Sequence, residues 1–334
     1  GSIALEGVTR NADNKLTYNI AFTTGTLTPD SDAARTLAQA GDTQGHFAKA
    51  TGDFYAVPSF AKKFDVLLKL SAQSTYPTGD TAATSRKIGG FHCLCVAVGT
   101  ISGHTLSGYV AGDILPLSIW DLKHRPVSSP EGMVWIEGIG KWIDIYLASY
   151  NGTKLVSEYN ATIADGTSSP AWHGEKFAEY LGLVGKSLLW RDEFIVAAKG
   201  SNEGTNIYGS AEVDKTGGHK DTVNRRMISN YGLEDCCGAL WQWGRDMFEY
   251  YLGSTWSSGN QYLSGYNWQT SPVYHSGTDA QSYGSCCGLL RRVLLGGCWG
   301  HSSYCGSRCA ACNSFSAYGG NADFGARGAS EPRA

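Results

Sequence analysis

The stretch 301–330 constrains the fold of this chain more than any other part, because of the residue types that it lacks. It contains no Leu, Ile, Val, Met, Trp, Pro, Thr, Lys, Glu or Gln, and consists only of Ser, Gly, Ala, Cys, Asn, Tyr, His, Phe, Asp and Arg. Without large aliphatic side chains, such a stretch cannot form a hydrophobic core of its own. It is therefore either a disordered tail or a set of loops that the preceding residues hold in place.

Ordered loops are the favoured interpretation. Trp299, Phe315 and Phe324, together with the two Arg-containing sequences GSR and GARG, are unusual in a disordered tail. The remaining residue types are those of antibody binding surfaces, where Tyr supplies rigid contact area and Ser, Gly and Asn supply adaptable hydrogen bonds. The stretch is therefore predicted to present a binding surface.

The composition of the whole chain favours a globular, β-rich protein. Its 334 residues are 42% hydrophobic and 17% charged, which indicates a globular protein. The chain includes 43 Gly, 10 Trp, 18 Tyr and 11 Phe, and so many glycines and aromatic residues favour turns and packed β layers over long helical bundles. A formal charge of −3 indicates neither nucleic acid nor an anionic membrane as a partner. Since no apolar run is long enough to cross a bilayer and the first residues, GSIALEG, do not resemble a secretory leader, we expect no membrane insertion.

The ten cysteines do not follow the spacing of a metal site. Several lie in adjacent pairs, and Cys309 and Cys312 form a C-x-x-C sequence without a second pair to complete a tetrahedral site. His92, His104 and His124 have no carboxylate at ligand spacing. We expect reduced thiols, no metal and no cofactor.

Three regions are predicted along the chain. Residues 1–50 contain too few apolar residues to form a core of their own. They therefore either lie on a neighbouring domain or pack against other copies of this chain as an oligomerisation element. Residues 51–165 contain short strands separated by Gly, Pro, Asn and Asp turns, a pattern typical of a β-sandwich. Residues 166–334 differ in character, with helical sequences followed by loops and short strands, which predicts an α+β domain.

Two helices are expected at the beginning of this last region. Residues 174–184 place apolar side chains at helical spacing. Residues 188–202 predict a second helix that starts at Trp190, with Asp192 as a plausible cap and Gly200 as the stop.

Four motifs of the third region resemble, in the same order, those of the formylglycine-generating-enzyme branch of the C-type lectin fold. They are WRDEFIVAAKG (190–200), GALWQW (238–243), RVLLGGCW (292–299), and the closing SR (307–308) with FGARG (324–328). The resemblance implies a C-type lectin domain over residues 166–334, behind a mainly β N-terminal region.

Within that branch, the ending GSR followed by GARG is most similar to the variable proteins of diversity-generating retroelements. In these proteins a reverse transcriptase alters adenines in certain codons, and the resulting codons exclude Lys, Glu, Gln, Met and Trp, which are all absent from 301–330. The resemblance implies a non-enzymatic receptor-binding protein with a hypervariable region at about 298–324. Phage members of the family also imply a homotrimer at a tail-fibre tip, with a protein or glycan receptor on a bacterial cell surface.

The motifs of the family indicate which positions of the C-terminal region vary and which are fixed. The positions expected to contact ligand are Cys298, Gly300, His301, Tyr304, Cys309, Ala311, Cys312, Ser314, Ser316, Tyr318, Gly319, Asn321 and Asp323. The positions expected to form the scaffold are Trp241, Trp243, Gly296, Gly297, Trp299, Cys305, Gly306, Ser307, Arg308, Gly325, Arg327 and Gly328. Among these, Arg308 and Arg327 are predicted to donate to buried carbonyls or a carboxylate.

Two alternatives remain within the same resemblance. One is a bacterial surface adhesin of the same family. The other is an oxidase like the formylglycine-generating enzymes, which hold copper between two cysteines. Cys305 matches the second of these cysteines, but the first falls near Gly300, which cannot coordinate copper, and Cys298 is the nearby thiol that could replace it. The pair Glu234 and Asp235 is interpreted as a loop or ion-pair feature and not as a catalytic acid pair.

Overall fold

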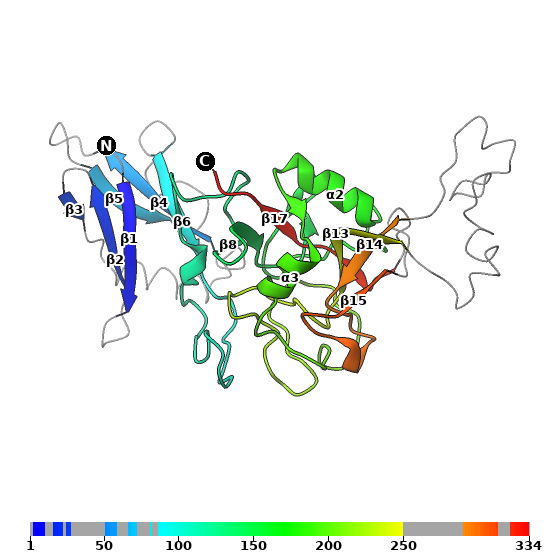
Figure 1. The fold of residues 1–334 in the computed structure, drawn as a ribbon. Helices are drawn as coiled ribbons and strands as arrows, with labels where there is room; N and C mark the ends of the chain where they lie inside the picture. Colours follow the sequence, from blue (N-terminus) through cyan, green and yellow to red (C-terminus); the bar gives the residue numbers. More distant parts are fainter. Residues whose placement is uncertain are drawn as a thin grey trace, which may run out of the picture.

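A computed structural model describes residues 3–10, 16–22, 25–27, 51–58, 66–71, 81, 86–249, 290–312 and 321–333 (Figure 1). Two antiparallel sheets form the N-terminal end. The first has the order β1-β2-β3, with the strands Ile3–Arg10, Leu16–Phe22 and Gly25–Leu27. The second has the order β5-β4-β6-β7, with β4 Thr51–Pro58, β5 Val66–Ser71, β6 Arg86–His92 and β7 Trp120–Asp121.

The C-terminal domain contains two further four-stranded sheets and a small hairpin. One sheet has the order β12-β17-β9-β8, with β12 Ser187–Leu188, β17 Gly328–Ser330, β9 Lys141–Asp144 and β8 Met133–Ile136. The other has the order β15-β14-β13-β16, with β15 Ala310–Ala311, β14 Leu290–Leu295, β13 Trp241–Glu249 and β16 Phe324–Gly325. The hairpin pairs β10 Ser149–Tyr150 with β11 Leu155–Val156. Two short 3-10 helices, η2 Pro116–Ser118 and η4 Ser302–Tyr304, lie in loops between the strands.

The first of these sheets crosses the boundary predicted at residue 165. β8 and β9, expected in the second region, pair with each other and, through β9, with β17 close to the C-terminus. Trp142 is matched with Ser330 and Ile143 with Ala329. The sequence does not predict this pairing, because the pattern that indicates a strand depends on neighbouring residues. The paired strands β9 and β17 lie far apart in the chain. The C-terminal domain therefore includes residues before 166. A β-sandwich over 51–165 stays a prediction.

Both predicted helices are present, and the second differs from its prediction in its cap and in its earlier end. α2, Gly174–Leu183, buries Phe177 and Leu181, and the ring of Phe177 stacks on Trp172 with centroids 5.2 Å apart. α3, Arg191–Ala197, begins after Trp190, whose N–H donates to Glu193 Oε2 over 3.0 Å.

Asp192 is therefore not the cap of α3, since Trp190 holds that position and Glu193 accepts its N–H. The side chain of Asp192 is 93% exposed in the first turn, where a carboxylate still favours the positive end of the helix dipole. α2 packs beside β12 and β13, and α3 packs beside β13 and β14. Both helices thus support the sheet that leads into the C-terminal segment. Within the part of the chain that the structure describes, no helix is long and apolar enough to span a bilayer.

Candidate functional site

The C-terminal segment, residues 296–312 and 321–325, forms closed loops on the β13–β14 sheet. It starts at Gly296 and Gly297, both with positive φ. A Cβ on Gly297 would lie 2.7 Å from the carbonyl oxygen of Tyr304, so the two strands of this loop approach more closely than any side chain allows. Gly296 also donates its N–H to Cys309 O (2.9 Å) and accepts from the N–H of Gly306 (3.1 Å). These bonds close the loop upon itself.

The segment is also bound to residues 203–239 of the same domain. Ser307 donates to Glu203 Oε1 from its N–H (3.0 Å) and from its hydroxyl (2.5 Å). Asn206 Nδ2 donates to the carbonyl oxygen of Trp299, and the N–H of Trp299 donates to Ala239 O over 2.9 Å. Hydrogen bonds therefore hold the backbone of the described part of the segment on both sides.

Most of the predicted contact positions in the described residues reach the surface. Gly300, His301, Tyr304 and Asn321 are exposed, and Tyr304 retains 71% of its accessible surface. Those that are partly exposed are Cys309, Ala311, Cys312 and Asp323. Figure 1 places η4 and β15 on the side of the C-terminal domain that points away from β1–β6. Ser314, Ser316, Tyr318 and Gly319 lie outside the described residues.

Cys298 differs from its predicted role, because it is only 1% exposed. A parallel bridge to Ala239 sets its backbone, and its Sγ lies 2.9 Å from His301 Nδ1 and 3.8 Å from Asp323 Oδ2. Burial raises the pKa of this thiol to about 11. Cys298 is thus a neutral core residue beneath the surface that His301 and Asp323 help to form.

The two arginines predicted to lock the loops have opposite environments. Arg327 is 1% exposed and donates to the carbonyl oxygens of Asp144 (2.7 Å), Ile145 and Glu234, as well as to Gln242 Oε1 (3.2 Å). Arg308 is exposed, and the described residues offer it no hydrogen-bond partner. The expectation for Arg308 is therefore wrong: the turn at 306–309 points its side chain to solvent. Arg308 is thus exposed, as are Ser303 and Ala310, and none of the three is predicted as a contact position from the family motifs.

The remaining scaffold positions lie at or near the core. Those that are buried are Trp241, Trp243, Gly296, Gly297, Cys305, Gly306, Gly325 and Gly328, and those that are partly buried are Trp299 and Ser307. Trp243 meets Phe324 edge to face with centroids 5.3 Å apart, and Trp241 meets His301 in the same way at 5.6 Å. The exposed ring of His301 therefore rests on a fixed aromatic support.

The thiols do not reproduce the two-cysteine copper site of the oxidases. Cys305 is buried, its Sγ donates to Cys298 O at 3.4 Å, and burial raises its pKa to about 12. The position matching the first cysteine, Gly300, has no donor side chain and is exposed. Among the described residues, no three His, Cys, Asp or Glu side chains are grouped so that they could hold a metal ion.

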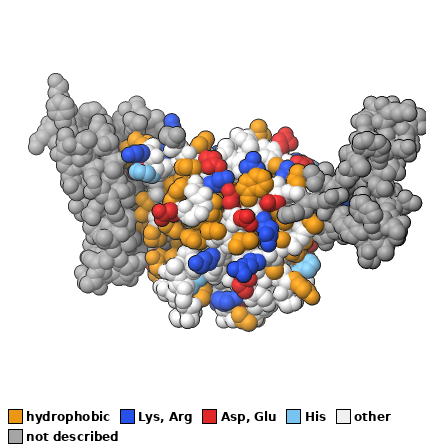
Figure 2. Space-filling view, in the orientation of Figure 1, with side chains coloured by type: hydrophobic (Ala, Val, Ile, Leu, Met, Phe, Trp, Pro, Cys, Tyr) orange, Lys and Arg blue, Asp and Glu red, His pale blue; other side chains and the backbone are white. Residues whose placement is uncertain are grey.

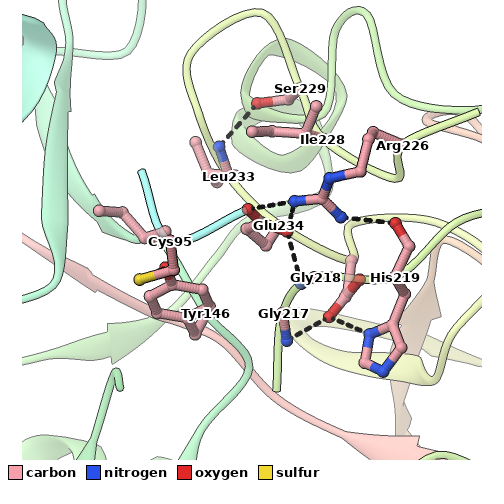
Figure 3. A network of polar contacts seen from close by, with 12 residues as sticks. Cys95, Tyr146, Gly217, Gly218, His219, Arg226, Ile228, Ser229, Leu233 and Glu234 are labelled. Atoms are coloured by element: carbon pink, nitrogen blue, oxygen red, sulfur yellow. Dashed lines mark hydrogen bonds and ion pairs between the residues drawn. The ribbon is translucent and has the colours of Figure 1, made fainter. Parts of the chain in front are cut away.

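A buried polar network supports the domain beside the C-terminal segment (Figure 3). Arg226 Nη2 lies 2.7 Å from both carboxylate oxygens of Glu234, and both side chains are 1% exposed. Asp235 Oδ2 accepts from Gly217 N–H (2.7 Å) and lies 2.9 Å from His219 Nδ1. The interpretation of Glu234 and Asp235 as an ion-pair feature is confirmed. The two carboxylates connect residues 217–219 and Arg226 to residues 234–235.

The described surface of this domain has no dominant charge on the face shown in Figure 2, where Lys and Arg side chains are interspersed with Asp and Glu. Such a surface suits specific contacts better than long-range attraction to a polyanion.

Comparison with known proteins agrees with this architecture. A family model described as Mtd second domain matches residues 8–121. The tail fiber receptor-binding protein of Bordetella phage BPP-1 is 31% identical over 286 residues, which cover 79% of this chain and 68% of that protein. The solved structure of the Major Tropism Determinant U1 variant has a TM-score of 0.65 at 25% identity, and that of the P3c variant 0.66 at 24%. Each match covers 99% of this chain and 83% of the other.

The matches extend from the N-terminal sheets to the C-terminal segment, and the aligned share of the phage protein exceeds two thirds of its length. They bear out both the family resemblance of the four motifs and the C-type lectin architecture of the C-terminal domain. The chain therefore belongs to the major tropism determinant family of phage tail-fibre receptor-binding proteins.

Proposed function

We propose that this chain is the receptor-binding protein of a phage tail fibre and that the exposed C-terminal segment contacts a receptor on the host cell. The observation that carries the proposal is the contrast within that segment. Tyr304 is 71% exposed, although a few residues away Ser307 and Trp299 are hydrogen-bonded to the rest of the domain. Exposed aromatic area on a rigid backbone is what a recognition surface needs, because little conformational entropy is lost on binding.

Binding, and not catalysis, is the function that these residues support. In the described part of the segment, Cys298 and Cys305, the thiols nearest to the copper-ligand positions of the oxidases, are buried with raised pKa values and do not form a thiolate pair. The relative from Bordetella phage BPP-1 is a tail-fibre protein, which favours a virion location over a bacterial surface adhesin.

We further infer that a retroelement diversifies the segment. Support comes from the restricted set of residue types in 301–330, which leaves out those that altered adenine codons cannot encode. The neighbouring DNA tests this inference. A near-copy of the final coding segment, differing at adenines and lying beside a reverse transcriptase gene, is expected, and the absence of such a copy contradicts it.

A homotrimer is proposed as the assembled form, with residues 1–50 contributing to the contacts between copies. In a trimer, binding at one site makes binding at the other two intramolecular, so that attachment is far tighter than one weak site allows. Light scattering of the full chain should give three times the mass of one chain, and a monomer would refute the proposal.

Cell attachment tests the receptor-binding function. Fluorescently labelled protein is titrated onto a panel of bacterial strains, and saturable binding to at least one strain is expected. Tyr304→Ala should weaken that binding by about tenfold or more, as truncation of an aromatic anchor does. The control Leu183→Ala removes another side chain, 74% exposed, at the end of α2, and should bind as the unsubstituted protein does. Equal binding by both variants would place the recognition surface elsewhere.

A further inference from the structure

A concave surface lies in residues 207–224, beside the C-terminal segment. This groove has a volume of about 520 Å³, within the range of roughly 300–1,000 Å³ that small-molecule sites occupy. Its lining includes the side chains of Ile207, Tyr208, Val213 and His219. None of the four belongs to the predicted variable region.

Backbone hydrogen bonds hold the groove in shape. Tyr208 N–H donates to Lys220 O (2.7 Å), and the N–H of Ile163 donates to Asp214 O (3.0 Å). Beneath the groove, the fully buried Asp221 accepts from the N–H groups of Val223 (3.1 Å) and Arg225 (2.9 Å). A groove fixed in this way does not need to be ordered when a ligand binds.

The lining combines an apolar floor, an aromatic wall and a polar rim. Ile207 and Val213 are 6% and 5% exposed, whereas Tyr208 is 71% exposed although it is a large aromatic residue. The rim carries two carboxylates, of Glu212 and Asp214, and two ammonium groups, of Lys215 and Lys220.

His219 adds a polar ring to the same lining. Its Nδ1 is engaged by Asp235 Oδ2 at 2.9 Å, and 23% of its side chain remains accessible (Figure 3). Donors and acceptors therefore surround an apolar floor, with the carboxylates of the rim equal in number to its ammonium groups.

We propose that this groove binds a neutral saccharide unit of the bacterial surface. One face of a pyranose ring presents C–H groups that can cover the exposed ring of Tyr208, and its hydroxyls act as donors to Glu212 and Asp214 and as acceptors from Lys215 and Lys220. An anionic ligand gains no net attraction, because the two carboxylates of the rim balance its two ammonium groups, and a lipid chain is disfavoured by the charged rim.

The groove adjoins the surface assigned to the receptor. Asn206, the residue before the groove, donates from Nδ2 to both Trp299 O and Ser210 Oγ, the latter over 3.0 Å. The groove, whose residues lie outside the predicted variable region, would therefore bind one part of the cell surface while the C-terminal segment binds a neighbouring part. This inference rests on the proposed receptor-binding function and names one class of ligand for it.

Saturation-transfer NMR on the full chain tests the groove. The probes are the methyl glycosides of glucose, galactose, mannose and N-acetylglucosamine at millimolar concentration. At least one should receive saturation, strongest on the ring protons that face Tyr208. Tyr208→Ala should reduce the signal about tenfold, as loss of an aromatic anchor does. Tyr208→Phe, which keeps the ring, and Tyr304→Ala, outside the groove, should retain it.

Two results would overturn the proposal: no transfer to any of the four glycosides, or equal transfer to the unsubstituted protein and to Tyr208→Ala. If Tyr208→Ala alters the circular dichroism spectrum, and therefore the fold, Tyr208→Leu is tested in its place. The same loss of signal is expected for it. The cell-attachment assay is read separately. If the unsubstituted protein attaches to no strain but still gives a glycoside signal that depends on Tyr208, the receptor-binding proposal fails while the groove is supported.

Discussion

Arg327 donates a hydrogen bond from Nη1 to the main-chain oxygen of Asp144 over 2.7 Å, although 183 residues separate them in the chain. The carboxylate of Asp144 in turn accepts from the N–H of Gly328 (3.1 Å) and lies 2.6 Å from Lys186 Nζ. The end of the chain is therefore built into the core of the C-terminal domain. The exposed loops lie between two fixed elements, β14 before them and β17 after them.

Replacing Arg327 tests this anchoring. Arg327→Lys keeps the charge but cannot reach all of the carbonyl oxygens of Asp144, Ile145 and Glu234, so buried acceptors lose their donor. Each such loss costs about 1–3 kcal/mol, and we expect the free energy of unfolding to fall by at least ~3 kcal/mol in urea titrations. Arg308→Lys is the matched control. Because Arg308 is exposed, a change within about 0.5 kcal/mol is expected, and a similar loss for both variants would contradict the assignment.

The buried ion pair supports a second comparison. Glu234→Gln leaves the charge of Arg226, 1% exposed, without its main partner. Breaking such a pair costs about 3–5 kcal/mol. The control Glu131→Gln removes one partner of Lys87, in a pair whose side chains are 30% and 38% exposed, and the expected loss is below about 1 kcal/mol. Chemical denaturation measures both, and equal losses would show that burial does not set the cost.

The pair of His219 and Asp235 makes stability depend on pH. The carboxylate of Asp235 raises the pKa of His219. The contribution of His219 is therefore complete below its unfolded pKa of about 6.5, and it is lost as the pH rises through the higher folded value. Burial acts to raise the pKa of Asp235, but the charge and hydrogen bond of His219 outweigh it and lower that pKa.

His219→Asn tests this linkage. In urea titrations from pH 5 to pH 9, a span of about two units either side of neutrality, the variant should lose most stability at the acidic end. The difference from the unsubstituted protein should shrink as the pH rises. A difference that is constant with pH would show that folding does not shift the pKa of His219.

Gly108 and Gly297 have the same φ of +83°. Substituting each of them distinguishes the cost of backbone strain from the cost of a steric clash. A Cβ on Gly108 meets nothing within 4 Å, whereas one on Gly297 lies 2.7 Å from Tyr304 O. Gly108→Ala should cost about 1–2 kcal/mol from the left-handed backbone alone. Gly297→Ala should lower the melting temperature clearly further, because the loop under Tyr304 must open. Equal melting temperatures for the two variants would contradict the close approach of this loop.

Local signals in the sequence predict the parts of the fold that depend on neighbours along the chain. The helix at 174–183 follows from its apolar spacing, and the positive φ of Gly296 and Gly297 fits the GG of the motif. The pairing of β9 with β17 is not predictable in this way, since it depends on which distant strand reaches a free sheet edge. For that reason the domain starts earlier than the strand pattern indicates.

The same limit explains the misassigned site residues. Arg308 and Arg327 stand in similar motifs, SR and AR, but only Arg327 enters the core, because it precedes β17 and the turn at Arg308 faces solvent. Cys298 lies between Gly297 and Trp299 in the motif, and only its burial in the structure, at 1% exposure, shows that its side chain points inward. The exposure of Tyr208 has no signal in the sequence, since tyrosine is intermediate between the residue types that are mostly buried and those that are mostly exposed.

The central claim is that an adaptable recognition surface lies on a fixed scaffold. A library in which His301, Tyr304 and Asn321, all exposed, are substituted together measures it directly when each variant is assayed for strain binding and for melting temperature. We expect variants that lose the original strain or gain a different one while their melting temperatures stay within about 2–4 °C, the shift that ~1 kcal/mol produces in a domain of roughly 150–250 residues. If every variant either binds as the unsubstituted protein does or unfolds, recognition does not reside in this segment.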